Sequence, residues 1–189
     1  MPDLQIAQEE HADRVLSESA FALLAGMMLD QQFPMERAFA GPAKVLERFG
    51  SLDPAAIAAA DPEEFAALCA TPPAVHRFPG SMAARLQELA QIVVDSYDGD
   101  ASALWNTADS GAEIFKRLTA LPGFGKQKAQ IFTALLGKQL GVRPDGWDTV
   151  AGAYAEEGSY RSVADVTDQA SLEKVRSFKK EQKAAAKSR

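Results

Sequence analysis

Cysteine is almost missing from this 189-residue sequence, in which Cys69 is the single example. One cysteine cannot close an internal disulfide, and it cannot supply the set of thiolates that holds an iron–sulfur cluster or a structural zinc ion. Apolar runs long enough to cross a membrane are missing too, and the first residues lack the positive charge and apolar stretch of a signal peptide. We therefore expect a cytoplasmic protein with no metal and no membrane contact, in which Cys69 is a small buried apolar residue.

Runs in which β-branched or aromatic residues alternate with polar ones are also rare, which argues against β-strands. Hydrophobic residues nevertheless make up 47% of the chain, enough to bury a sizeable core, and Leu, Ala and Met among them favour helices. The sequence shows neither an internal repeat nor a long linker. We predict an all-α fold in one unit of two lobes, residues 1–189.

Apolar residues at helical spacing predict a succession of helices. The first is expected to begin behind Ser17 as its N-cap and to end before Asp30, and the second, Met35–Phe49, to be closed by Gly50. His76 falls in a proline-rich loop without an acidic or cysteine companion, so we expect an ordinary surface residue. Other helices are predicted behind Asp53-Pro54 and Asp61-Pro62, over residues 81–97, 112–121 and 126–140, and behind a cap at Asp168 or Ser171.

Charge is distributed unevenly along the chain. The net charge is −6, but the last sixteen residues carry seven Lys or Arg against one Glu, a balance of +6, so the preceding 173 residues carry −12. An acidic body with a basic tail is an asymmetric molecule. The tail is either a solvated helix end or a contact to nucleic acid.

The most informative stretch is Leu-Pro-Gly-Phe-Gly-Lys-Gln-Lys-Ala, which joins two predicted helices. Gly123 and Gly125 allow positive φ angles and close backbone approach, so amides of the turn and of the next helix can converge on one phosphate oxygen. Phe124 between them is expected to anchor the turn in the core, while Lys126 and Lys128 add positive charge. The stretch predicts a sequence-independent phosphate clamp, and the alternative is a tight turn that binds nothing.

This stretch resembles the helix-hairpin-helix of the HhH-GPD superfamily of base-excision DNA glycosylases, which includes endonuclease III and the adenine glycosylases. The likeness covers roughly residues 20–150 and includes Met-Leu-Asp-Gln-Gln at 28–32, Glu-Arg-Phe-Gly at 47–50 and Asp-Pro-Glu-Glu at 61–64. It implies a six-helix barrel lobe, with double-stranded DNA across the cleft to a second lobe. The expected ranges are 30–136 for the barrel, 118–129 for the hairpin within it, and 1–29 with 137–189 for the terminal lobe and basic tail.

The resemblance also implies roles for individual residues. Gln31 or Gln32 would fill the gap left in the duplex by a flipped nucleotide, because an amide can hydrogen-bond an orphaned base in several ways. Gln127 and Trp147 are expected to lie at the base pocket. The residues expected to contact DNA are Pro122, Gly123, Phe124, Gly125, Lys126, Lys128, Gln31 and Gln32.

A catalytic aspartate follows the hairpin helix in this superfamily, and its carboxylate stabilises positive charge on the sugar. Asp145 has about the expected spacing, whereas Asp148 keeps the apolar-Asp-Thr context although no histidine follows Thr149. We favour Asp148 narrowly over Asp145. Gln127 stands where bifunctional members carry a nucleophilic lysine, and an amide cannot form a Schiff base.

The sequence therefore predicts a monofunctional DNA glycosylase, active as a monomer in base excision repair and without a cofactor, although a monovalent cation at the hairpin is left open. The alternative is a non-catalytic protein that recognises lesions or unusual DNA structure through the same clamp with a degenerate active site.

Overall fold

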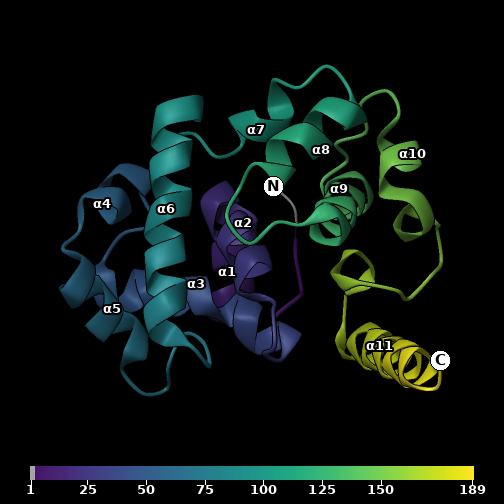
Figure 1. Cartoon of the computed structure of the whole chain (residues 1–189), viewed down its shortest axis with the longest axis horizontal. Coiled ribbons are helices and arrows are strands. Elements are labelled where there is room, and N and C mark those ends of the chain that lie inside the picture. Colours follow the sequence, from purple (N-terminus) through teal and green to yellow (C-terminus); the bar gives the residue numbers. More distant parts are fainter. Residues whose placement is uncertain (1–2) are drawn as a thin grey trace.

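The computed structural model describes residues 3–189, and its regular elements there are helices (Figure 1). The only β pairing within this range is an isolated bridge between Ser110 and Asp145. The predicted all-α fold is confirmed. The elements, in chain order, are α1 (Glu10–Glu18), α2 (Ala20–Leu29), α3 (Met35–Phe49), α4 (Pro54–Ala59), α5 (Pro62–Ala70), α6 (Pro79–Tyr97), α7 (Ala103–Asn106), α8 (Gly111–Thr119), α9 (Lys126–Gln139), α10 (Trp147–Ala151), the 3-10 helices η1 (Gly152–Ala155) and η2 (Val163–Asp165), and α11 (Gln169–Lys187).

Helix α2 lies at the centre of the molecule, and every residue in it after Ala20 is buried. Helices α4, α5 and α6 lie on one side of it in Figure 1, and α8 to α11 on the other. A Cβ on Gly26 would come within 2.5 Å of the Phe39 ring, so this glycine lets α2 pack closely on α3. The lobe boundaries expected at 29/30 and 136/137 remain a prediction.

The start of α2 differs from expectation. The side chain of Ser19, not Ser17, caps the helix by accepting a hydrogen bond from the amide of Ala22 at 3.0 Å. Ser17 instead belongs to the preceding helix α1, where its hydroxyl accepts from the amide of Leu4 and donates to the carbonyl of Asp13. Ser17 and Ser19 are both suitable N-cap residues by type. The packing of α1 decides between them, because it engages the Ser17 hydroxyl.

The other helix ends follow the sequence closely. Gly50 closes α3 with a left-handed φ of 87°. Asp53 and Asp61 cap α4 and α5, each with proline at the first helical position. The helix predicted over 81–97 begins slightly earlier, at Pro79.

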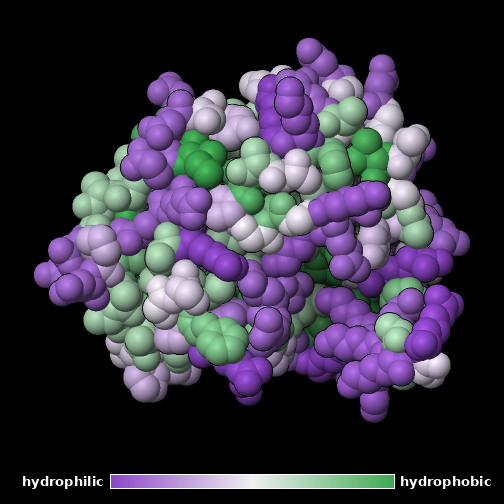
Figure 2. Space-filling model, in the orientation of Figure 1, coloured by the Kyte–Doolittle hydropathy of each residue, from purple (hydrophilic) through white to green (hydrophobic). Residues whose placement is uncertain are grey.

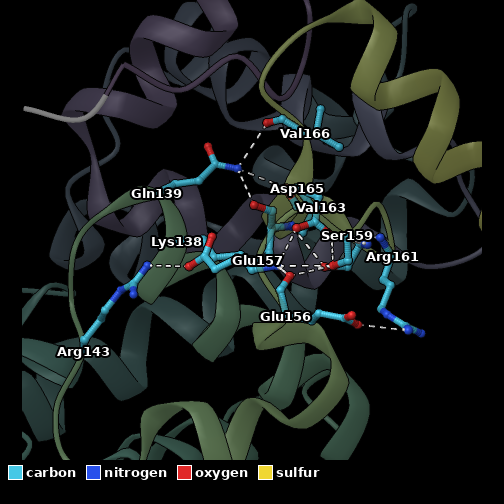
Figure 3. Close-up of polar contacts among 12 residues, drawn as sticks. Lys138, Gln139, Arg143, Glu156, Glu157, Ser159, Arg161, Val163, Asp165 and Val166 are labelled. Carbon is cyan, nitrogen blue, oxygen red and sulfur yellow. Dashed lines mark hydrogen bonds and ion pairs between the residues drawn. The ribbon is translucent and has the colours of Figure 1, made fainter.

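The segment after α9 is tied to that helix by a buried polar network (Figure 3). Lys138 Nζ lies 2.6 Å from Asp165 Oδ1, with the two side chains only 7% and 5% exposed. It also donates to the carbonyl of Glu156 at 2.7 Å, while the Gln139 amide donates to three carbonyls of η2 and the residue after it, those of Val163, Ala164 and Val166. These contacts form the platform on which α11 packs through Leu172 and Val175.

Cys69 lies fully buried in α5, and burial raises the pKa of its thiol to about 11. It is a small apolar core residue, as predicted. A four-thiolate cluster does not fit a chain with one cysteine, and residues 3–189 hold no group of three His, Cys, Asp or Glu side chains placed to bind a metal. In the same range, helices long and apolar enough to cross a membrane are absent.

Candidate nucleic-acid interface

Helices α8 and α9 are joined by the turn that contains the two glycines of the motif. Gly123 has a left-handed φ of 77°, and a Cβ there would meet Cγ of Met28 at 3.0 Å. Gly125 has an ordinary φ of −83°, and a Cβ there would have no neighbour within 4 Å. The expectation of a positive φ at both glycines is therefore wrong for Gly125, whose backbone instead leaves open space in front of α9.

The amino-terminal end of α9 is exposed and uncapped. Gly125 is its N-cap, and within residues 3–189 no side chain bonds the first amides of the helix. The first intrahelical bond runs from the amide of Ala129 to the carbonyl of Gly125 at 3.0 Å, so the N–H groups of Lys126 and Gln127 precede it. Free amides at the positive end of a helix dipole form a ready site for an anion.

Phe124 anchors this turn. Its side chain is only 4% exposed, and its ring meets that of Phe132 edge-on with the centroids 6.0 Å apart. The sequence expectation that Phe124 points into the core is met. The turn is thus fixed from inside, while both glycines are exposed and Gly125 faces open space.

Lys128 does not face the same way as Lys126. Two residues along a helix are about 200° apart around its axis, and Lys128 Nζ donates to the carbonyls of Met27 and Met28 at 2.7 and 3.1 Å. Burial lowers the pKa of this lysine to about 8, although Asp30 nearby favours its charged form. Lys128 therefore caps the carboxyl end of α2. Of the two lysines expected to add positive charge at the clamp, Lys126 is the exposed one.

The turn that follows α2 carries the two glutamines. The Gln31 side-chain amide donates to the carbonyl of Met28 at 2.9 Å and accepts from Arg85 at 3.2 Å, which holds it beside the hairpin glycine Gly123. Gln32 is exposed and has a left-handed φ of 52°. Such a backbone is uncommon for a residue other than glycine, and strain of this kind gathers at functional sites.

His76, in the loop between α5 and α6, contacts this turn, and the expectation of a surface residue is wrong. The residue is 1% exposed, and its Nδ1 accepts from the amide of Phe78 at 3.0 Å. The other ring nitrogen, Nε2, therefore carries the hydrogen and donates to the carbonyl of Gln31 at 2.9 Å. Burial lowers the pKa of the ring, which favours this neutral form.

Helix α10 and η1 run back along α9 in the opposite direction. The ring of Trp147 packs on Gly137, where a Cβ would meet it at 2.5 Å. Gln130 donates to the carbonyl of Val150 at 3.1 Å, and nearer the hairpin Gln127 donates to the hydroxyl of Tyr154 at 2.9 Å. The side chain facing Gln127 is thus Tyr154, which the sequence did not single out.

The two candidate aspartates lie at the other end of α9. Asp145 is exposed and accepts a backbone bond from Gly111 at 2.8 Å. Asp148 is exposed in the first turn of α10 and accepts from the amide of Thr149 at 2.9 Å. Ten residues of helix, about 15 Å, separate Gln127 from the glycine beneath Trp147. Among residues 3–189, the Gln127 side chain is hydrogen-bonded to Tyr154, and neither aspartate carboxylate bonds to it.

Trp147 is held in place rather than free to stack on a base. Its ring lies between Gly137 and the Arg143 guanidinium, which is 4.6 Å from the ring centroid. Its backbone passes so close to Gly111 that a Cβ on that glycine would meet Trp147 Cα at 2.6 Å. This packing fixes the start of α10, and with it the position of Asp148.

Comparison with protein families gives one finding that fits this geometry. The family model described as HhH-GPD superfamily base excision DNA repair protein matches residues 25–189. Comparison with curated proteins and with solved structures gives no match.

Proposed function

Since the chain belongs to the HhH-GPD superfamily of base excision DNA repair proteins, we propose that it is a monofunctional DNA glycosylase that binds double-stranded DNA and removes a damaged or modified base. The observation that carries this proposal is the open, uncapped start of α9 directly beside the glutamine turn. The two features together provide a grip on the DNA backbone and a side chain within reach of the base stack.

The grip acts on a phosphate. The amides at the start of α9 donate to a phosphate oxygen, and the missing side chain of Gly125 lets the phosphate approach the backbone. Lys126 adds a positive charge from the exposed face of the helix. None of these contacts reads a base, so the clamp positions DNA without selecting a sequence.

The glutamine turn acts on the base stack. Because both ends of the Gln31 amide are engaged with Met28 and Arg85, we assign the insertion into the duplex to the exposed Gln32. Its amide can donate and accept, and it therefore suits whichever base is left unpaired by flipping.

The reaction is hydrolysis without strand cleavage. The bond from the sugar C1′ to the base nitrogen breaks, water bonds to C1′, and the base leaves with the bonding pair and takes up a proton. Gln127 offers no amine for a covalent intermediate, and its amide is hydrogen-bonded to Tyr154. Asp148 or Asp145 would stabilise the positive charge on the sugar, which requires the start of α10 to approach the flipped nucleotide in the complex.

A second function is favoured by the placement of these aspartates. Both lie toward the far end of α9 from the hairpin, beside the packed ring of Trp147. A protein with the same grip and no carboxylate at the sugar would recognise a lesion or a flexible site in DNA without removing a base.

One assay separates the two functions. Duplexes that each carry one alkylated, oxidised or deaminated base are incubated with the protein, and alkali then reveals abasic sites. Strand breaks only after alkali establish a monofunctional glycosylase, whereas trapping with borohydride would refute it. Duplex binding without base release would support the non-catalytic function, and failure to bind any duplex would overturn both.

Variants assign the residues. Asp148→Asn or Asp145→Asn is expected to abolish base release and preserve affinity, with the exposed Asp95→Asn on α6 as the control. Gly125→Asp is expected to remove binding without unfolding the protein, because the added side chain enters open space but places negative charge where the phosphate sits. Full activity of both aspartate variants would remove the catalytic assignment.

A further inference from the structure

The basic residues of α11 are arranged as a stripe. At 100° per residue, they fall within an arc of about 100° on one face of the helix. The stripe consists of Arg176, Lys179, Lys180, Lys183 and Lys187. Lys174 lies on the opposite face, where its amine is 4.4 Å from the centroid of the Tyr160 ring.

The first two residues of the stripe face the glutamine turn. Arg176 forms an ion pair with Glu36, and Lys179 Nζ lies 3.9 Å from the carboxylate of Asp30. These two acids flank the Gln31–Gln32 turn in sequence, and Asp30 also faces Lys128 of the hairpin helix. The face of α11 that carries the stripe is therefore turned toward the site where the hairpin and the glutamines would hold DNA.

The rest of the stripe continues past the body of the protein. From Lys180 onward every side chain is exposed, and the C-terminal end of α11 stands clear of the other helices (Figure 1). Residues 180–187 add about 12 Å of helix beyond the last contact. Figure 2 shows mainly hydrophilic side chains over this region. The buried residues of α11 are Ser171, Leu172 and Val175, so packing against the core does not account for the exposed lysines of residues 180–187.

We propose that Lys180, Lys183 and Lys187 form a second phosphate-contacting surface, which binds the DNA backbone beside the nucleotide held at the hairpin and the glutamine turn. The inference rests on the proposed DNA binding and adds a second contact to it. It also explains how a body with a charge of −12 can approach a polyanion: the acids nearest the glutamine turn are paired with Arg176 and Lys179, and the free lysines beyond them are positive.

The test is the salt dependence of duplex binding, measured by fluorescence anisotropy from about 50 to about 200 mM salt. For Lys180→Gln/Lys183→Gln/Lys187→Gln we expect a slope of log Kobs against log salt that is shallower by up to about 2.7, because each phosphate contact contributes about 0.9. The three side chains are exposed, so the thermal midpoint should not change. Lys174→Gln, on the opposite face, is the control and should leave the slope unaltered.

The outcomes distinguish this inference from the proposed function. If the wild-type protein binds DNA, Gly125→Asp abolishes binding and the triple variant keeps the wild-type slope, the second surface is wrong and the clamp stands. If the wild-type protein binds no duplex, both are wrong. A change for Lys174→Gln as large as one third of that for the triple variant would show a general effect of net charge and would also overturn the assignment of one face.

Discussion

Nε2 of His76 donates a hydrogen bond to the backbone carbonyl of Gln31 across 2.9 Å, although the two residues are 45 positions apart. The bond ties the loop after α5 to the turn after α2. The same turn is held from a second side by Lys128 of α9, through the carbonyls of Met27 and Met28, and from a third by Lys179 of α11. The glutamines are thus presented by a turn that three distant segments fix in place.

The state of His76 makes the stability of the protein depend on pH. Burial lowers the folded-state pKa below the ordinary 6.5, so as pH falls the unfolded chain takes up a proton first and the free energy of unfolding decreases. The decrease should begin near 6.5, reach at most about 1.4 kcal/mol per pH unit from this group, and end at the folded-state pKa. Urea denaturation between about pH 7 and about pH 5 measures it.

The control is the other histidine. His76→Gln should remove this part of the pH dependence. It should also weaken duplex binding, because the glutamine turn loses the hydrogen bond from His76 to the Gln31 carbonyl. His11 is partly exposed beside Glu47, and His11→Gln should retain the wild-type decrease between 6.5 and the folded-state pKa of His76. If His76→Gln keeps the full wild-type pH dependence, His76 is not the group responsible.

Sequence reasoning succeeded where the cause is local. The caps at Asp53 and Asp61, the glycine that closes α3 and the hairpin turn all depend on residues within one helical turn. It failed for His76 and Lys128, because each bonds a backbone carbonyl at the end of α2 or in the turn after it, far away in sequence. Pattern alone shows that a lysine follows the hairpin, but whether it faces solvent or the end of α2 is decided by the rotation of α9 in the assembled core.

The same limit applies to the candidate site. The spacing of Asp145 and the context of Asp148 follow from sequence, but their distance from the hairpin depends on the direction in which α10 runs along α9. That direction is set by the contacts of Trp147 with Gly111 and Gly137. Tyr154 shares a hydrogen bond with Gln127 for the same reason, and no local signal marks it.

Lys126 and Lys128 should behave differently when each is replaced by methionine. Lys126→Met should leave stability unchanged and make the salt dependence of DNA binding shallower by about 0.9, the contribution of one phosphate contact. Lys128→Met should lower the free energy of unfolding by about 1 to 3 kcal/mol, because two carbonyls at the end of α2 lose their side-chain hydrogen-bond donor. Chemical denaturation and anisotropy titrations measure the two effects.

The pH dependence gives a further check on Lys128. Its folded-state pKa of about 8 lies below the ordinary 10.5. Between these values the unfolded chain holds more protons, so the wild-type free energy of unfolding increases as the pH rises. Lys128→Met should lack this gain, and Lys126→Met should keep it. If the slope of log Kobs against log salt changes for Lys128→Met and not for Lys126→Met, the phosphate contact belongs to Lys128 and the assignment to Lys126 is wrong.

The ion pair of Lys138 and Asp165 should hold the segment after α10 against α9. Both side chains are almost fully buried, so Lys138→Met leaves Asp165 without a compensating charge and should cost about 3 to 5 kcal/mol. Glu157→Gln breaks the exposed pair with Arg143 (Figure 3) and should cost less than about 1 kcal/mol. Urea denaturation compares the two variants directly.

Loss of this ion pair should also open the chain locally, because η2 is the platform for α11. In limited proteolysis, Lys138→Met should be cleaved between residues 152 and 168 faster than Glu157→Gln. The increase in cleavage rate should be smaller in the double variant Lys138→Met/Asp165→Leu, which buries no unpaired charge. If DNA binding weakens in step with this cleavage, the position of α11 contributes to the interface. Cleavage without any loss of affinity would show that the DNA contact needs neither η2 nor the helix that packs on it.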